Sequence, residues 1–181
     1  MRKLIVSVFM TADGVIDQVD RWGMMEGDHQ QHSLEQLLAA DLLVLGRKTY
    51  EGLASVWPDM KGDNVGFKDP VNAMPKVVAS RSLKEPLTWN ATLLKGEFAE
   101  SVAALKQQSG RNMVMYGCGQ AAHHLWKRGL VDELRLWTHP VVFGKGQRPF
   151  HSDEPVNMQL AGSTTFSSGV TLLCFKPPVS R

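Results

Sequence analysis

The stretch "MVMYGCGQAAHHLW", from Met113 to Trp126, decides the fold class. Its apolar first half predicts a buried strand over Met113–Tyr116, and its second half predicts a helix over Gln120–Arg128. Gly117 and Gly119 stand between them, where bare backbone suits either a tight turn or the close approach of a phosphate. A lone junction of this kind is more often a plain turn, so the rest of the chain decides between the two.

Two earlier strand ends in the chain resemble this one. Leu42–Leu45 is a short apolar run followed by Gly-Arg-Lys-Thr, and we expect a helix to begin at Arg47. Lys76–Ala79 is a second apolar run, followed by Ser80 and Arg81. The carboxyl ends of parallel strands share one edge of a sheet, so these three strand ends can lie side by side. Helix N-termini and added positive charge at that edge describe a crevice for a multiply phosphorylated ligand.

The other predicted elements alternate between strand and helix and then become strands alone. A strand over Leu4–Met10 is followed by a long loop, from Thr11 to about Gln30. Helices are expected over Ser33–Ala40 and Glu97–Gln108, irregular chain over Lys61–Pro75, and further strands over Thr92–Leu94, Glu133–Val142, Met158–Phe166 and Gly169–Phe175. This order predicts a single α/β domain over residues 1–181: a three-layer sandwich with a central mixed, mostly parallel sheet, helices on both faces and an antiparallel C-terminal strand set.

The composition is that of an ordinary globular protein. The 181 residues are 43% hydrophobic and 21% charged, with a formal net charge of +2. No run of Lys or Arg favours nucleic acid, and no apolar stretch approaches the ~20 residues of a membrane span, so neither is expected as a partner. Cys118 and Cys174 lack metal-ligand spacing, which favours buried thiols in a reducing compartment and therefore a cytoplasmic location.

Polar residues of the long loop supply the candidate proton donors. These catalytic candidates are Asp13, Asp28 and His29, although Asp13-Gly14 is also a turn signal. The spacing of Asp28, His29 and His32 permits a metal ion, but no second cluster accompanies them. A polar loop is the better interpretation, and no metal is expected.

Together these segments resemble the dihydrofolate reductase-like superfamily. "LLVLGRKTYEGL", "PKVVASRSL" and "MVMYGCGQAAHHLW" look like its three cofactor-binding segments, and "VFMTADGVI" resembles its first strand and the start of its active-site loop. "VDELRLWTHPVVFGKGQRPF" is similar to the branch that contains the bacterial riboflavin-pathway reductase domain. The likeness extends from Leu4 to Phe175.

The resemblance implies an NADPH-dependent reductase whose cofactor lies along the shared edge, and it also points to a homodimer. By position, Phe9 would meet the nicotinamide amide with its backbone, and Ile16 would pack near the ring. Ser80 and Arg81 would bind the 2′-phosphate that distinguishes NADPH from NADH. The remaining phosphates would be held by Gly46, Arg47, Lys48 and Thr49, and by a second turn of Gly117, Cys118, Gly119 and Gln120.

The substrate half departs from the family pattern. Dihydrofolate reductases carry an acid on the helix before the Gly-Arg strand, whereas here Gln30 stands nearest that place and Glu35 lies too far along. The expected substrate is a small heterocyclic or carbonyl compound, as the resemblance to the 5-amino-6-(5-phosphoribosylamino)uracil reductase domain implies. The alternatives are weak dihydrofolate reduction and an NADPH-binding sensor without turnover.

Overall fold

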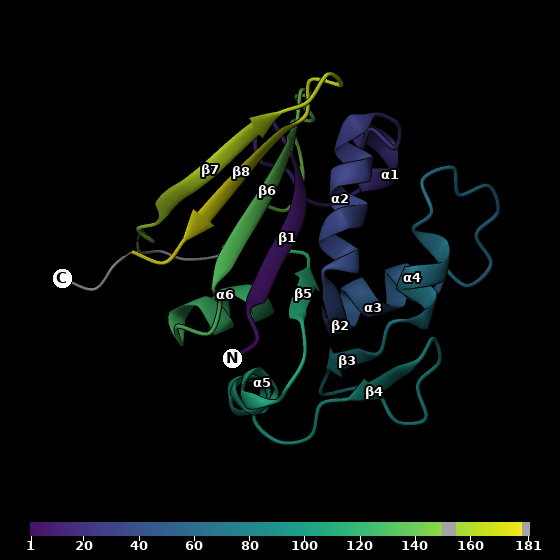
Figure 1. Cartoon of the computed structure of the whole chain (residues 1–181), viewed down its shortest axis with the longest axis vertical. Helices are drawn as coiled ribbons and strands as arrows, with labels where there is room; N and C mark the ends of the chain where they lie inside the picture. Colours follow the sequence, from purple (N-terminus) through teal and green to yellow (C-terminus); the bar gives the residue numbers. More distant parts are fainter. Residues whose placement is uncertain (150–154, 179–181) are drawn as a thin grey trace.

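A computed structural model describes residues 1–149 and 155–178 of the chain (Figure 1). In this part the strands are β1 (Leu4–Thr11), β2 (Ala40–Gly46), β3 (Lys76–Ala79), β4 (Ala91–Leu93), β5 (Asn112–Tyr116), β6 (Glu133–His139), β7 (Gln159–Thr165) and β8 (Thr171–Lys176). The helices are α1 (Val19–Trp22), α2 (Asp28–Leu38), α3 (Arg47–Ala54), α4 (Lys68–Ala73), α5 (Phe98–Gln107) and α6 (Gln120–Lys127).

All of these strands belong to one sheet, in the order β4-β3-β2-β5-β1-β6-β8-β7. The strands from β4 to β6 in this order pair in parallel with their neighbours. β8 pairs antiparallel with β6, and β7 pairs antiparallel with β8. The predicted mixed sheet, mostly parallel with an antiparallel C-terminal part, is confirmed. Phe150, at the end of the last segment quoted above, lies outside the described residues.

The two faces of the sheet carry two cores, as the alternation of side chains along a strand requires. On one face, Leu4, Val6 and Val8 of β1 pack in a cluster that includes residues of α5 and α6. On the other face, Ile5 packs in a cluster that includes residues of α2, α3 and α4. Figure 1 shows the same division, with α2, α3 and α4 on one side of the strands and α5 and α6 on the other. The three layers are therefore those expected.

The largest difference from the expected elements is the start of α2. The helix begins at Asp28 and not at Ser33, because its buried face in the first turns is polar and hides the apolar periodicity: His29, Gln30 and Ser33 are all buried. Two short helices, α1 and α4, lie in segments expected to be irregular. β6 ends at His139, before Pro140, since proline has no N–H for the ladder.

The two edge strands of the sheet are β4 and β7, and the longer of them is β7. The strands predicted over Glu133–Val142 and Gly169–Phe175, which are β6 and β8, lie inside the sheet. Every residue of β7 is exposed. Among the described residues, no helix is both long enough and apolar enough to cross a membrane.

Candidate functional site

The three segments singled out in the sequence lie at the carboxyl ends of neighbouring strands. β2 pairs in parallel with both β3 and β5, and β5 pairs in parallel with β1. Gly46 ends β2, Ser80 follows β3, and Gly117 follows β5. The turns after these strands therefore share one edge of the sheet, as the sequence predicted.

Two helices begin at this edge, and each has a glycine as its N-cap. Gly46 and Gly119 give no side-chain hydrogen bond to the first N–H groups of α3 and α6, and neither helix has an acid in its first turn. A Cβ at Gly46 would lie 4.0 Å from Ala121 Cβ in the first turn of α6, so the two N-termini are close together. In contrast, Glu97 caps α5 by accepting the N–H of Glu100 at 2.8 Å. Adjacent, uncapped helix N-termini favour a bound anion.

The turn after β5 presents backbone toward open space. Gly117 has φ +89°, a left-handed conformation that favours glycine, and a Cβ there would lie 3.2 Å from Thr49 Oγ1. A Cβ at Gly119 would meet nothing within 4 Å. The Cys118 side chain between them is buried in the core. Cys118 can therefore offer its backbone, and the open space beside Gly119 fits a cofactor diphosphate.

Cations surround this edge. Arg47 and Lys48 are exposed in the first turn of α3, and Arg81 is exposed after β3. Arg47 Nη1 lies 3.1 Å from Glu51 Oε2, but an exposed pair of this spacing contributes only ~0.3–0.5 kcal/mol, so the guanidinium can turn to a phosphate. Ser80 Oγ accepts two following backbone N–H groups, at 3.2 and 3.0 Å, which shapes the turn that carries Arg81. Gln120, the first residue of α6, is also exposed.

Phe9 and Ile16 lie at the end of β1 and in the loop that follows. The Phe9 ring is half-buried, with its centroid 4.9 Å from that of His139 and 6.2 Å from that of Trp137. The Ile16 N–H donates to the Gln147 carbonyl at 2.9 Å, so the loop is docked on the segment after β6. Contact of these two residues with a nicotinamide ring stays a prediction.

Asp13 is tied into the turn after β1. Its carboxylate accepts the Thr11 hydroxyl at 2.6 Å and the N–H groups of Phe143 and Gly144 at 3.1 and 2.8 Å. The bond from Thr11, followed by those from the backbone, lowers the pKa of Asp13 to about 2. An ionised acceptor with these partners favours the turn role over proton donation.

Asp28 and His29 connect the start of α2 to the turn between β7 and β8. The Asp28 carboxylate accepts the Ser167 N–H at 2.8 Å, a bond that lowers the pKa of this acid. His29 is fully buried; its Nδ1 lies 2.9 Å from Ser168 Oγ, and its Nε2 donates to the Met24 carbonyl at 2.9 Å. Both candidate proton donors are thus occupied by structural contacts. Within the described residues, no three His, Cys, Asp or Glu side chains group as a metal ion would require.

A polar network under α2 was not predicted from the sequence. Gln36 Nε2 and Trp137 Nε1 both donate to Ser7 Oγ at 3.0 Å, and Arg135 Nη1 donates to Gln36 Oε1 at 3.1 Å. Since Arg and Trp side chains only donate, these bonds fix the orientation of the Gln36 amide. Gln36 also hydrogen-bonds the hydroxyl of Tyr116, the last residue of β5, whose pKa is raised by burial. A serine inside the apolar run of β1 was the one signal that the sequence offered.

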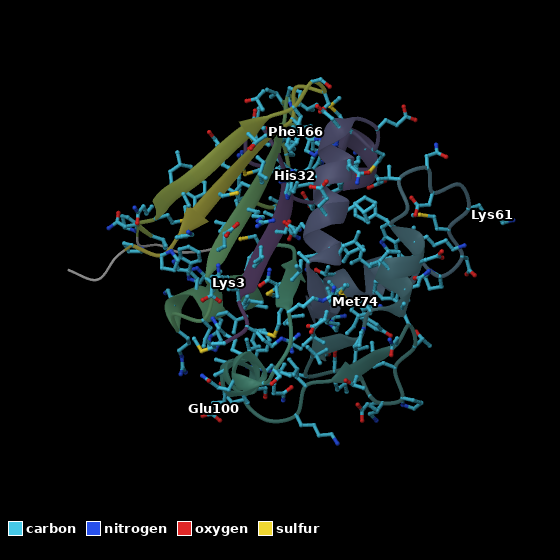
Figure 2. The ribbon with its side chains drawn as sticks, viewed as in Figure 1. Lys3, His32, Lys61, Met74, Glu100 and Phe166 are labelled. Carbon is cyan, nitrogen blue, oxygen red and sulfur yellow. The ribbon has the colours of Figure 1, made fainter. Side chains whose placement is uncertain are left out.

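A group of packed rings extends from the network under α2 toward β8. His32 and Phe166 lie close together in Figure 2, between α2 and the β7–β8 end of the sheet, with ring centroids 5.6 Å apart. Phe166 also stacks on Trp137, with centroids 5.9 Å apart. His139, expected only as a strand residue, is fully buried against Phe9 and His29. This side is therefore filled by protein side chains, unlike the space at Gly119.

Comparison with known proteins agrees with this geometry. Residues 2–172 match the family model of the RibD C-terminal domain. The uncharacterized protein YyaP of Bacillus subtilis is 30% identical over 189 residues, which cover 96% of this chain and 94% of that protein. The uncharacterized protein YwjB of the same organism is 24% identical, over 94% of this chain and 96% of that protein.

Solved structures share the fold at lower identity. A protein from Shewanella sp. PV-4, described as belonging to riboflavin biosynthesis, is 19% identical with a TM-score of 0.75, over 98% of this chain and 99% of that chain. A deaminase/5-amino-6-(5-phosphoribosylamino)uracil reductase from Thermotoga maritima is 14% identical with a TM-score of 0.67, over 98% of this chain and 57% of that chain. The match over nearly the whole sequence and the shared sheet lead to one assignment. The chain belongs to the RibD C-terminal domain family, in the dihydrofolate reductase-like superfamily.

Proposed function

We propose that the protein is an NADPH-dependent reductase that transfers hydride to a small heterocyclic or carbonyl compound. The observation that carries this proposal is the pair of glycine-capped helices, α3 and α6, whose uncapped N–H groups meet at one edge of the sheet. The substrate class rests on likeness to the Thermotoga maritima protein, which is described as a uracil-derivative reductase.

The chain's own residues would bind and orient the cofactor, which supplies the hydride when bound. The turns Gly46–Thr49 and Gly117–Gln120 hold its phosphates by backbone N–H groups and helix dipoles. Arg81 and Ser80 hold the 2′-phosphate by charge-assisted hydrogen bonds. Phe9 and Ile16 give the nicotinamide an apolar surface that limits access of water.

The proton that completes the reduction has a different source from the hydride. Asp13 and Asp28 are ionised acceptors with lowered pKa values, and His29 is fully buried with both ring nitrogens in contact with partners. These contacts make solvent water the better proton source in the closed structure. Asp13, in the loop after β1, or Asp28 and His29, at the start of α2, would serve only after these contacts are broken.

The test is a titration of the protein with NADPH and NADH, followed by NADPH oxidation over a panel of carbonyl and imine heterocycles. We expect tighter binding of NADPH by about 1–3 kcal/mol, the scale of hydrogen bonds to charged groups, and oxidation with at least one carbonyl heterocycle. Equal dissociation constants would overturn the cofactor assignment. Binding without oxidation across the panel would favour the sensor alternative.

We also propose that the protein is a homodimer that covers β7. This strand is one of the two edges of the sheet, each of its residues is exposed, and Leu160 is 55% exposed. Exposed edge strands of this length are usually covered because their N–H and C=O groups invite pairing. Sedimentation should show a dimer at micromolar concentration, and Leu160→Lys should weaken it. A wild-type protein that sediments as a monomer alone would remove the proposal.

A further inference from the structure

Met24, in the loop between β1 and α2, is held between two buried histidines. Its N–H donates to His139 Nδ1 at 3.2 Å, and its carbonyl accepts His29 Nε2–H at 2.9 Å. Both rings are 0% exposed, and their centroids lie 5.7 Å apart, edge to face. The Trp22 ring, from the same loop, packs edge-on against His139 at 5.4 Å. The end of β6 and the start of α2 therefore both bind this loop.

The bond from Met24 fixes the protonation of His139. A neutral imidazole has one acceptor and one N–H, so an Nδ1 that accepts places the proton on Nε2. Nε2 of His139 is buried and has no hydrogen-bond partner among the described residues. An unpaired buried donor is costly, which points to an acceptor atom that arrives from outside the chain.

We propose that His139 is a positioning residue for the loop of residues 12–27: its Nδ1 holds the closed loop through Met24, which fixes the proton on Nε2, and this Nε2–H donates to a carbonyl oxygen of the substrate once movement of the loop has admitted it. The Phe9 ring lies 4.9 Å from the His139 ring, at the end of β1 where the nicotinamide is expected. The donor role rests on the proposed function. The loop role does not.

Protonation of His139 breaks the contact to the loop, because a protonated ring has no acceptor at Nδ1. Burial, followed by the charge of His29, lowers the pKa of His139 to about 4, from 6.5 for an ordinary histidine. Closure is therefore fully stabilised above about pH 6.5, and this stabilisation is lost as the pH falls from 6.5 toward 4. The loop carries Asp17, Asp20, Arg21 and Glu26, and α2 carries His32; two further acids are Asp13 in the loop and Asp28 in α2. The lowered pKa values of these two acids keep them charged over most of this window.

The loop role is tested by hydrogen exchange at the Met24 amide of the ligand-free protein, expressed as a protection factor at pH 7.5 and pH 5. The protection factor should fall on the order of tenfold between these values, as the shift in pKa requires. His139→Asn places a non-titrating Oδ1 near the position of Nδ1. The protection factor of this variant should therefore be as high at pH 5 as at pH 7.5. His139→Phe keeps a ring but no acceptor, so protection should be low at both values.

Each variant is first checked for a cooperative melt, and His32→Asn serves as the matched control because the His32 ring lies on the same side, against Trp137 and Phe166. Unchanged protection in the Phe variant, or a pH dependence that persists in the Asn variant, would overturn the loop role. Low protection of the Met24 amide in wild type at pH 5 and in His139→Phe at both pH values, together with high protection in His139→Asn, distinguishes a positioning role from simple packing.

The donor role is tested with the carbonyl heterocycles of the oxidation panel. The longer amide of the His139→Gln variant can place an N–H near the position of Nε2, whereas the amide of His139→Asn does not reach it. His139→Gln should therefore keep KM within a few-fold of wild type, and His139→Asn should raise it at least about tenfold. Equal KM values for wild type and His139→Asn would overturn the donor role. No oxidation by wild type would overturn the proposed function together with the donor role, while the exchange result would still decide the loop role.

Discussion

The two sides of the carboxyl edge of this sheet are built in opposite ways. At the starts of α3 and α6, glycine N-caps leave backbone N–H groups without side-chain partners, and a Cβ at Gly119 would enter open space. Beneath α2, the polar groups of Gln36, His29 and Asp28 are already bonded within the protein. The first side leaves these N–H groups open to a ligand, whereas at these three residues of the second side the partners belong to the chain itself.

This difference indicates on which side a ligand can bind with the smaller cost in free energy. A phosphate at the α3–α6 side satisfies groups that are otherwise exposed to water, so binding displaces only solvent. A substrate beneath α2 must first compete with hydrogen bonds made inside the protein. The closed α2 side therefore predicts that substrate entry requires movement of the loop that Met24 anchors, while cofactor binding does not.

The largest effect should come from a Cβ placed on the open side. Gly119→Val should weaken NADPH binding at least about 100-fold, or ~2.7 kcal/mol, because the side chain would fill the space proposed for the diphosphate. Gly119 does not have a positive φ, so the fold should remain intact. Fluorescence titration with NADPH measures the loss. Gly52→Val is the matched control, since a Cβ at Gly52 also meets nothing within 4 Å. Normal NADPH binding by Gly119→Val would show that the turn of Gly117–Gln120 has only a structural role.

Dihydrofolate should be a poor substrate, since the α2 side offers no acid to its pteridine in the closed structure. Asp28 is bonded to the β7–β8 turn, Gln30 Nε2 donates to the Met24 carbonyl at 3.0 Å, and Glu35 is exposed. We expect kcat/KM below ~10⁴ M⁻¹s⁻¹, the lower end of the usual range, and weak binding of methotrexate. The assay is NADPH oxidation with dihydrofolate at neutral and mildly acidic pH. Ordinary turnover with tight inhibition would show that Asp28 reaches the pocket after the loop rearranges.

Loss of the network under α2 should reduce stability without affecting the cofactor. Gln36→Leu removes one hydrogen-bond partner each from Arg135, Ser7 and the Tyr116 hydroxyl, although Trp137 still donates to Ser7 and Glu133 still pairs with Arg135. We expect a loss of about 1–3 kcal/mol in the free energy of unfolding, and a fall in Tm of about 2–4 °C for each kcal/mol. Urea and thermal unfolding measure it, with Gln31→Leu on the exposed face of α2 as control. A change in NADPH affinity larger than the change in the control would contradict the separation of the two sides.

The smallest effect concerns the choice between the two nicotinamide cofactors. Arg81→Ala should reduce the preference for NADPH over NADH by about tenfold, ~1.4 kcal/mol, because one charge-assisted contact to the 2′-phosphate is lost. Affinity for NADH itself should stay near the wild-type value. Paired titrations of wild type, Arg81→Ala and the exposed neighbour variant Lys84→Ala provide the comparison. A preference that survives in Arg81→Ala would assign the 2′-phosphate to another cation, such as Arg47.

The shared edge of these strand ends was predictable from the sequence because its signals are local. A strand that ends in glycine and turns into a helix is encoded within about ten consecutive residues, as in Met113–Trp126. Two such segments and a third strand end at Ser80, with Arg47, Lys48 and Arg81 beside them, indicated a shared edge before the order of the strands was known. The parallel pairing of β2 with β3 and β5 follows from the same pattern of alternating strands and helices.

Only the tertiary structure decided the α2 side, because its contacts join residues far apart in the chain. Met24 meets His139 across 115 positions, and Asp28 meets Ser167 across 139. No local pattern encodes such pairs, and the polar residues that make them hide the helical periodicity at the start of α2. For the same reason the sequence left Asp13, Asp28 and His29 as candidate proton donors, with only the turn signal of Asp13-Gly14 to set one of them apart. Their burial and hydrogen-bond partners, which depend on the folded chain, give each of them a structural task.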